Sequence, residues 1–114
     1  MIKIKRVYDE PLKEDGYRIL VDRLWPRGLT KEHAAVDLWL KDIAPSTPLR
    51  QWYHETKKWD EFQKKYRNEL IKKKALIEKL TLLEQEKKSL TLVYAAKDQE
   101  QNNAVILKKV LQND

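Results

Sequence analysis

One segment of the chain joins the pattern of a buried strand to side chains that can bind an anion. The apolar run 19–21 is followed directly by charged, aromatic and turn-forming residues: Asp22, Arg23, Leu24, Trp25, Pro26, Arg27 and Gly28. Arginine presents a planar fork of donors that fits a carboxylate or a phosphate, and Pro-Arg-Gly is typical of a shaped turn. We therefore predict a ligand site at this point, facing an anionic group.

Polar residues also follow the other segments that are predicted to be strands. If the strands are parallel, their carboxyl ends meet at one edge of the sheet, which is where open α/β sheets bind ligands. The predicted ligand-binding residues at this edge are Arg23, Trp25, Arg27, Lys41, Ser46, Arg50, Asp98 and Asn102. Asp22 and Asp42 are the candidate catalytic residues, because a carboxyl group beside a bound anion can orient it or carry a proton.

Several of these residues have a structural alternative. Asp22 could form an ion pair with a neighbouring arginine that closes the turn, and Ser46 and Asp98 could be helix caps. Trp25 could stack on a ligand ring or cover an edge of the core. His54 is the only residue placed to act as a general base at neutral pH.

Four short segments have the apolar patterns of strands: residues 2–7, 17–22, 36–40 and 90–96. The segments between them have helical patterns, beginning with the start signal Ser46-Thr47-Pro48. Apolar residues at helical spacing then run from Trp59 to Leu83. One unbroken helix over 58–87 would be about 45 Å long, so we predict a break near 71–75. Asp98 and Gln101 resemble a capping box that opens a last helix.

Strands separated by helices predict an α/β fold. We expect a single compact domain over residues 1–114, with a small, mostly parallel sheet of about four strands flanked by helices. The strand order and the oligomeric state stay open.

The composition excludes several kinds of chemistry. There is no cysteine, so disulfides, thiolate zinc sites and thiol nucleophiles are absent, and the two histidines have no metal-ligand spacing. Only two glycines occur, which excludes a glycine-built phosphate loop, and no cofactor is identified. No apolar run reaches the roughly 18 residues of a membrane span. We expect a soluble cytoplasmic protein without a membrane partner.

The formal net charge of +6 leaves a second function open. Much of the excess lies in the helical stretch 57–74, which contains Lys57, Lys58, Lys64, Lys65, Lys72, Lys73 and Lys74. Such a run is typical of a solvated helix face, but it could also bind nucleic acid nonspecifically. The main hypothesis is a pocket for an anionic small molecule. The alternatives are this nucleic-acid face and a non-catalytic interaction module, and enzymatic activity stays open.

Three blocks of the sequence resemble the YeaO-like family of domains of unknown function, number 488 in that series. They are YDEPLKEDGYRILVDRLWPRGLTKE, DLWLKDIAPSTPLRQWY and LTLVYAAKDQEQNNAVIL, and they span residues 8–107. The resemblance implies a compact bacterial or archaeal α/β domain with no established reaction. The residues that it marks are Asp22, Arg23, Trp25, Pro26, Arg27, Gly28, Trp39, Lys41, Asp42, Ser46, Arg50, Trp52, Asp98 and Asn102.

The chain also departs from the family pattern. Relatives often have arginine where this chain has Lys97, and histidine where it has Asn103. A proton-carrying role for that histidine is not available here. Longer, more distant relatives have cysteines near the last strand, whereas this chain has none. The resemblance therefore does not imply a thiol mechanism for this chain.

Overall fold

The computed structural model describes residues 1–113 and has a four-stranded parallel sheet at its centre. The strands are β1 (Ile2–Arg6), β2 (Tyr17–Leu20), β3 (Leu38–Trp39) and β4 (Leu90–Tyr94). Their order across the sheet is β1-β4-β2-β3, and every neighbouring pair is parallel. The predicted α/β fold with a mostly parallel sheet is confirmed.

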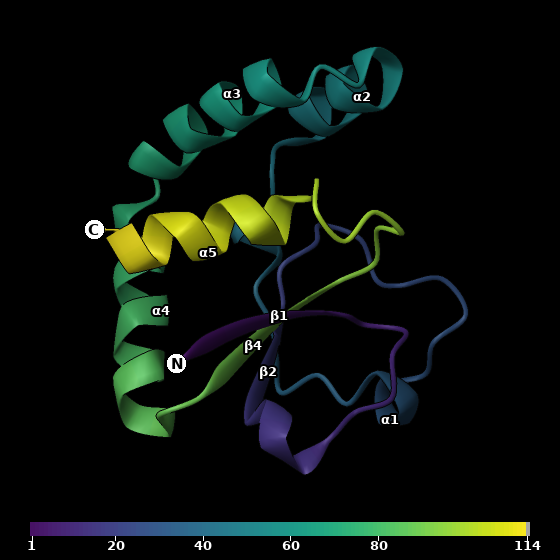
Figure 1. Cartoon of the computed structure of the whole chain (residues 1–114), viewed down its shortest axis with the longest axis vertical. Coiled ribbons are helices and arrows are strands. Elements are labelled where there is room, and N and C mark those ends of the chain that lie inside the picture. Colours follow the sequence, from purple (N-terminus) through teal and green to yellow (C-terminus); the bar gives the residue numbers. More distant parts are fainter. Residues whose placement is uncertain (114) are drawn as a thin grey trace.

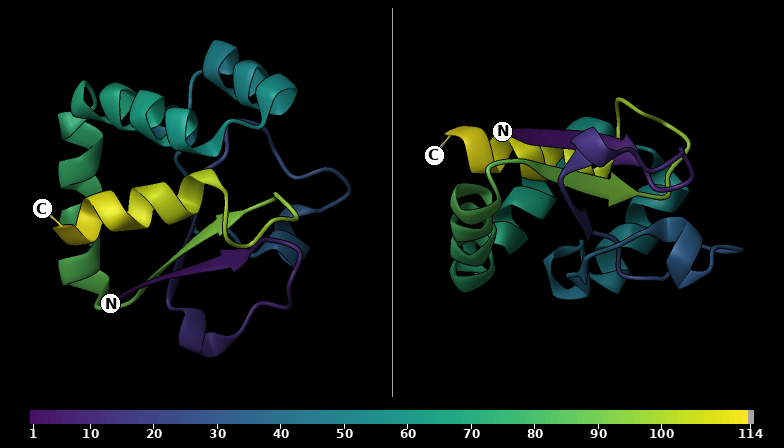
Figure 2. Two further views of the ribbon diagram at one scale, coloured as in Figure 1. Left: turned by 45° about the horizontal axis from the view of Figure 1, so that its top comes forward. Right: turned by 90° about the horizontal axis from the view of Figure 1, so that it is seen from below.

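Helical segments connect the strands and cover the sheet. They are η1 (Lys13–Asp15), α1 (Lys31–Ala34), η2 (Lys41–Ile43), α2 (Thr47–Thr56), α3 (Trp59–Ile71), α4 (Lys74–Lys87) and α5 (Asn103–Asn113). In Figure 1, α2, α3 and α5 lie above the strands and α1 lies below them, while α4 stands at the end where the strands begin. The left view of Figure 2 shows α5 on the near side of the strands and α1 behind them.

Alternating side chains of the strands enter two hydrophobic clusters, one on each face of the sheet. Ile19 and Leu92 belong to the larger cluster, which α3, α4 and α5 complete. Leu20 and Val93 belong to the smaller one, with Ala34 of α1 and the partly buried rings of Trp25 and Trp39. Both faces are covered, which explains why neighbouring residues such as Ile19 and Leu20, or Leu92 and Val93, are both apolar.

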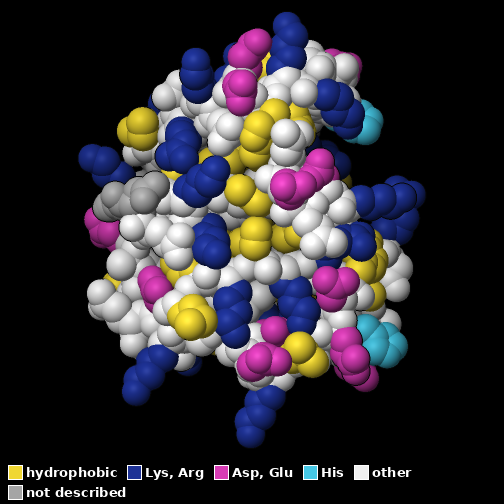
Figure 3. Space-filling view, viewed as in Figure 1, with side chains coloured by type: hydrophobic (Ala, Val, Ile, Leu, Met, Phe, Trp, Pro, Cys, Tyr) yellow, Lys and Arg dark blue, Asp and Glu magenta, His cyan; other side chains and the backbone are white. Residues whose placement is uncertain are grey.

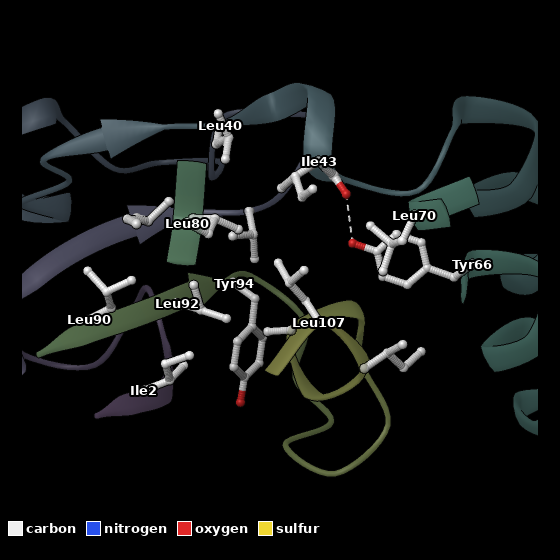
Figure 4. Close-up of a cluster of buried hydrophobic side chains, with 14 of the residues drawn as sticks. Ile2, Leu40, Ile43, Tyr66, Leu70, Leu80, Leu90, Leu92, Tyr94 and Leu107 are labelled. Carbon is white, nitrogen blue, oxygen red and sulfur yellow. Dashed lines mark hydrogen bonds between the residues drawn. The ribbon is translucent and has the colours of Figure 1, made fainter. Parts of the chain in front are cut away.

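Tyr66 anchors α3 in the larger cluster (Figure 4). Its ring is fully buried, and its hydroxyl group donates a 2.7 Å hydrogen bond to the carbonyl oxygen of Ile43. This bond ties α3 to the loop between β3 and α2. Burial is the main reason why the pKa of the Tyr66 hydroxyl is raised, so this group stays protonated.

The predicted start of α2 and the predicted break after α3 are both confirmed. The Ser46 hydroxyl oxygen accepts a hydrogen bond from the amide of Leu49, with proline in the first turn. The long helical pattern is divided at residues 72–73 into α3 and α4. A further turn occurs at Lys57, which has a left-handed backbone (φ 57°) and separates α2 from α3.

Two sequence predictions were wrong in detail. The third strand is only Leu38–Trp39, because β3 pairs with β2 alone over two residues and the chain then coils into η2. The last helix begins at Asn103, not just after Asp98. Asp98 closes a local turn by accepting the amides of Glu100 and Gln101, and Asn102 caps the helix by accepting the amide of Val105.

Candidate functional site

The sheet topology opens a cleft at the carboxyl ends of β2 and β4. The chain leaves β2 toward α1 on one face, whereas it leaves β4 toward α5 on the other face. Neighbouring parallel strands whose connections diverge in this way leave a crevice between their ends. The middle and C-terminal part of α2 closes its third side.

The cleft has a volume of about 1000 Å³. It is lined by Tyr8, Asp22, Arg23, Leu24, Trp25, Pro26, Arg27, Ala44, Pro45, Arg50, Gln51, Tyr53, His54, Glu55, Lys57, Phe62, Ala95, Ala96, Lys97, Gln101, Asn102 and Asn103. Six of the ten predicted site residues are therefore brought together: Asp22, Arg23, Trp25, Arg27, Arg50 and Asn102. A cleft of this size can hold a small-molecule ligand.

Asp22 supplies a partly buried carboxylate to the cleft. One oxygen accepts the backbone amide of Ala95 at 2.8 Å, and the other accepts the side-chain amide of Asn103 at 3.3 Å. Among the described residues no cation forms an ion pair with it. Burial raises the pKa of Asp22, although these two hydrogen bonds and the charge of Arg50 act in the opposite direction.

Asn103 is a site residue that the sequence prediction missed. Its side-chain N–H donates to the carbonyl oxygen of Val21 at 2.9 Å as well as to Asp22. Its side-chain oxygen accepts no hydrogen bond within residues 1–113. Every fully buried side-chain oxygen among these residues has a hydrogen-bond partner, so the Asn103 oxygen is not fully buried. That oxygen therefore reaches the solvent of the cleft. The sequence prediction placed the cap of the last helix at Asp98, so Asn103 was expected inside that helix. Its contact with the end of β2 was therefore not predicted.

Arg23 and Trp25 line the cleft but use their donors to brace its walls. Arg23 donates from Nε to the carbonyl oxygen of Pro45 and from Nη2 to that of Ala44, both at 3.2 Å. The Trp25 indole donates to the carbonyl oxygen of Leu29 at 2.7 Å and packs edge-on against Trp39. These contacts favour the structural alternative for both residues: they hold the loop after β2.

Four cations at the cleft have no carboxylate partner in the described part of the chain: Arg27, Arg50, Lys57 and Lys97. The guanidinium groups of Arg27 and Arg50 donate no hydrogen bond to residues 1–113, and both side chains are exposed. The backbone carbonyl of Arg27 accepts a bond from the Tyr8 hydroxyl, which fixes the loop that carries it. These groups can bind an external anion without first breaking an internal contact.

The other four predicted site residues lie outside the cleft lining: Lys41, Asp42, Ser46 and Asp98. Lys41 lies over the ring of Trp39, and Asp42 is an exposed residue 3.9 Å from Arg23. The Ser46 hydroxyl donates to Glu69 and caps α2. Because β3 is short and lies at the sheet edge, η2 carries Lys41 and Asp42 away from the ends of β2 and β4. Asp98 instead closes a local turn in the loop after β4.

Aromatic side chains form one wall of the cleft. Tyr53 of α2 stacks on Phe62 of α3, with ring centroids 4.4 Å apart. Lys57 lies over the Tyr53 ring, and His54 is exposed at the same wall without a hydrogen-bond partner among the described residues. Phe62 is buried behind Tyr53, so the wall presents the half-buried Tyr53 ring next to the cations.

Some lysines of the predicted basic face over residues 57–74 make contacts within the chain. Figure 3 shows one face of the molecule, on which lysine and arginine side chains are spread with acidic side chains among them. Lys73 is bound to the carbonyl oxygens of Asp42 and Ala44, and burial lowers its pKa. Lys65 lies over the ring of Trp52. These contacts do not test whether the protein binds nucleic acid, which stays a prediction.

Two further findings concern the described residues 1–113. They contain no group of three or more histidine, aspartate or glutamate side chains arranged to hold a metal ion. None of their helices is long and apolar enough to cross a bilayer.

The comparisons with known proteins place the chain among uncharacterised bacterial relatives. A family model described as the inactive DUF488-N3 subclade matches residues 1–114. The uncharacterised protein YeaO of Escherichia coli K12 is 46% identical over 107 residues, which cover 93% of this chain and 92% of that protein. The uncharacterised protein Rv3073c of Mycobacterium tuberculosis H37Rv is 45% identical over 78 residues, or 68% of this chain and 66% of that protein. No solved structure gives a significant match.

Proposed function

The chain belongs to the YeaO-like DUF488 family, and we propose that it is a binding protein for an anionic small molecule. The ligand, carrying a phosphate or a carboxylate, occupies the cleft at the ends of β2 and β4. The observation that carries this proposal is that Arg27 and Arg50 line one cleft with no acceptor for their guanidinium groups in residues 1–113. Positively charged clefts of this kind concentrate anions.

Binding without turnover fits the residues of the cleft best. No serine or threonine is among its lining residues, so the cleft offers no aliphatic hydroxyl nucleophile. The subclade that matches the chain is described as inactive. Asp22 then acts as a hydrogen-bond acceptor for the ligand, and Asp42, outside the cleft, has no role in binding.

Thermal shift and calorimetry with phosphorylated and carboxylated metabolites test the proposal. At least one anion is expected to raise the melting temperature of the wild-type protein, and Arg27→Ala and Arg50→Ala are expected to reduce its affinity about tenfold each. The matched controls are Lys31→Ala and Lys64→Ala, which remove one exposed charge outside the cleft. Equal affinities in all four variants, or no binding by any anion, would contradict the proposal.

Nonspecific nucleic-acid binding has its own test. It predicts retention of DNA or RNA on a filter at low salt and a steep loss of affinity as salt rises. The substitutions Lys64→Ala and Lys65→Ala should then weaken retention more than Arg27→Ala. Absence of retention at low salt removes this alternative.

A further inference from the structure

The cleft combines a negative floor with positive groups around it. The floor contains the Asp22 carboxylate and the free side-chain oxygen of Asn103, which are both acceptors. Arg27, Arg50 and Lys97 supply only donors and positive charge. One ligand group cannot satisfy both regions.

A simple anion therefore does not fill this cleft. A phosphate or carboxylate placed at the floor would meet the like charge of Asp22, which no cation within residues 1–113 neutralises by an ion pair. Such an anion would bind at the arginines, and water would occupy the floor of the cleft. The floor instead requires a ligand part that carries N–H donors.

The acceptors at the floor are only partly used. A carboxylate has about four lone-pair sites, and Asp22 accepts two hydrogen bonds from the chain. Burial raises the pKa of Asp22, so donors from a ligand would supply solvation that the ionised group lacks.

The neighbouring wall offers an aromatic contact for a flat ring. Phe62 is buried behind Tyr53, and the half-buried Tyr53 ring lines the cleft beside the cations, where a planar ligand ring can pack against its exposed part. A ligand with a planar, donor-bearing part and an anionic part matches all three surfaces.

We propose that the cleft takes a nucleoside monophosphate, with guanine as the preferred base. This inference depends on the proposed function and names the ligand class for the same site. The phosphate binds Arg27 and Arg50, and the base lies toward Asp22 and Asn103. Guanine presents two adjacent donors, the ring N1–H and the 2-amino group, to the two carboxylate oxygens. Uracil presents one N–H between two carbonyl oxygens, which face the carboxylate unfavourably.

Calorimetry with five probes tests the inference: GMP, AMP, UMP, guanosine and inorganic phosphate. GMP should bind most tightly, and AMP, UMP, guanosine and phosphate should each bind at least about tenfold more weakly. Adenine presents its amino group beside the acceptor N1, so it lacks the second donor of guanine. Asp22→Asn should remove the preference for GMP over UMP, and it should not weaken phosphate binding, because it removes a negative charge near Arg50. Asn103→Ala is the second floor variant and should reduce the same preference, with circular dichroism confirming that both variants are folded.

The outcomes separate this inference from the proposed function. Equal affinity for GMP and UMP, or a GMP affinity that neither floor variant changes, overturns the nucleotide assignment. If Arg27→Ala still weakens binding of another anion, the anion site survives that result. If no anion binds, both proposals fail together. Arg27→Ala lowering GMP affinity to that of guanosine supports both.

Discussion

Asp15 and Asp22 lie beyond opposite ends of β2, and their carboxylates have opposite environments. Asp15, just before the strand, accepts hydrogen bonds from Lys5 and from Arg18, whose Nη1 lies 2.7 Å away. Asp22, just after the strand, accepts two hydrogen bonds from uncharged groups and forms no ion pair among the described residues. Burial acts to raise the pKa of both groups. At Asp15 the hydrogen bonds outweigh burial and lower the pKa, whereas at Asp22 the pKa stays raised.

This difference distinguishes a structural charge from one that is open to a ligand. The Arg18 guanidinium also donates to the carbonyl oxygens of Ala34 and Ala35, so the cluster at Asp15 is closed on itself. It joins β2 to the end of α1 and leaves no group for an external partner. The carboxylate of Asp22 adjoins a cleft in which Arg27 and Arg50 form no ion pair with residues 1–113. Only the second arrangement can gain free energy from a bound molecule.

The largest expected effect is on stability at Asp15. Asp15→Asn should lower the free energy of unfolding by about 3–5 kcal/mol, because it leaves the nearly buried Arg18 without its counter-charge. Urea unfolding followed by circular dichroism measures this loss. Glu14→Gln, at the exposed neighbouring residue, is the control and should have little effect. Equal stability of the two variants would contradict a structural role for the cluster.

The two carboxylates should also respond to pH with opposite signs. The folded pKa of Asp15 lies below its ordinary value of 3.8, so its contribution is present above that value and is lost as the pH falls further. The folded pKa of Asp22 lies above 3.8, so its ionisation lowers stability as the pH rises through that region. Urea unfolding from about pH 6 to about pH 2 should show the stability gap between wild type and Asp15→Asn closing in acid. A gap that stays constant would show that Asp15 does not titrate as described.

A smaller effect is expected at Ser46, which the sequence placed in the ligand site. Ser46→Ala removes the cap of α2 and the 2.6 Å hydrogen bond to Glu69, and should cost about 1–2 kcal/mol. It should leave the affinity for any cleft ligand unchanged, since Ser46 does not line the cleft. Calorimetry of this variant with the best anion measures that. A large loss of affinity would place Ser46 in the site after all.

The smallest expected change in stability is at Asp22. Asp22→Asn should change the free energy of unfolding by less than about 1 kcal/mol, because the amide removes a poorly solvated charge and keeps an acceptor for the Ala95 amide. Unfolding in urea at neutral pH measures it. A loss as large as that of Asp15→Asn would show that Asp22 is as structural as Asp15 and would remove the contrast.

The sequence predicted the framework of this fold well because its signals are local. The apolar segments around β1, β2 and β4, the Ser46 cap and the break after α3 depend on neighbouring residues. The shortness of β3 could not be predicted, because its pairing with β2 is a long-range contact. The cap of α5 was misplaced because Asp98 and Asn102 are both good capping residues, and only packing against the end of β2 selects between them.

Residue types and their order were enough to show that charged residues follow apolar strands and that arginine side chains are present to bind an anion. Which of those charges already have a partner within the fold followed only from the three-dimensional arrangement of the segments. Arg18, Arg23 and Lys73 bind carbonyl or carboxylate oxygens within the chain, whereas the guanidinium groups of Arg27 and Arg50 bind none among residues 1–113. The physical reason is that a charged side chain has the same chemistry in every sequence, but its partners are set by contacts between distant segments. Those contacts form only when the sheet is assembled.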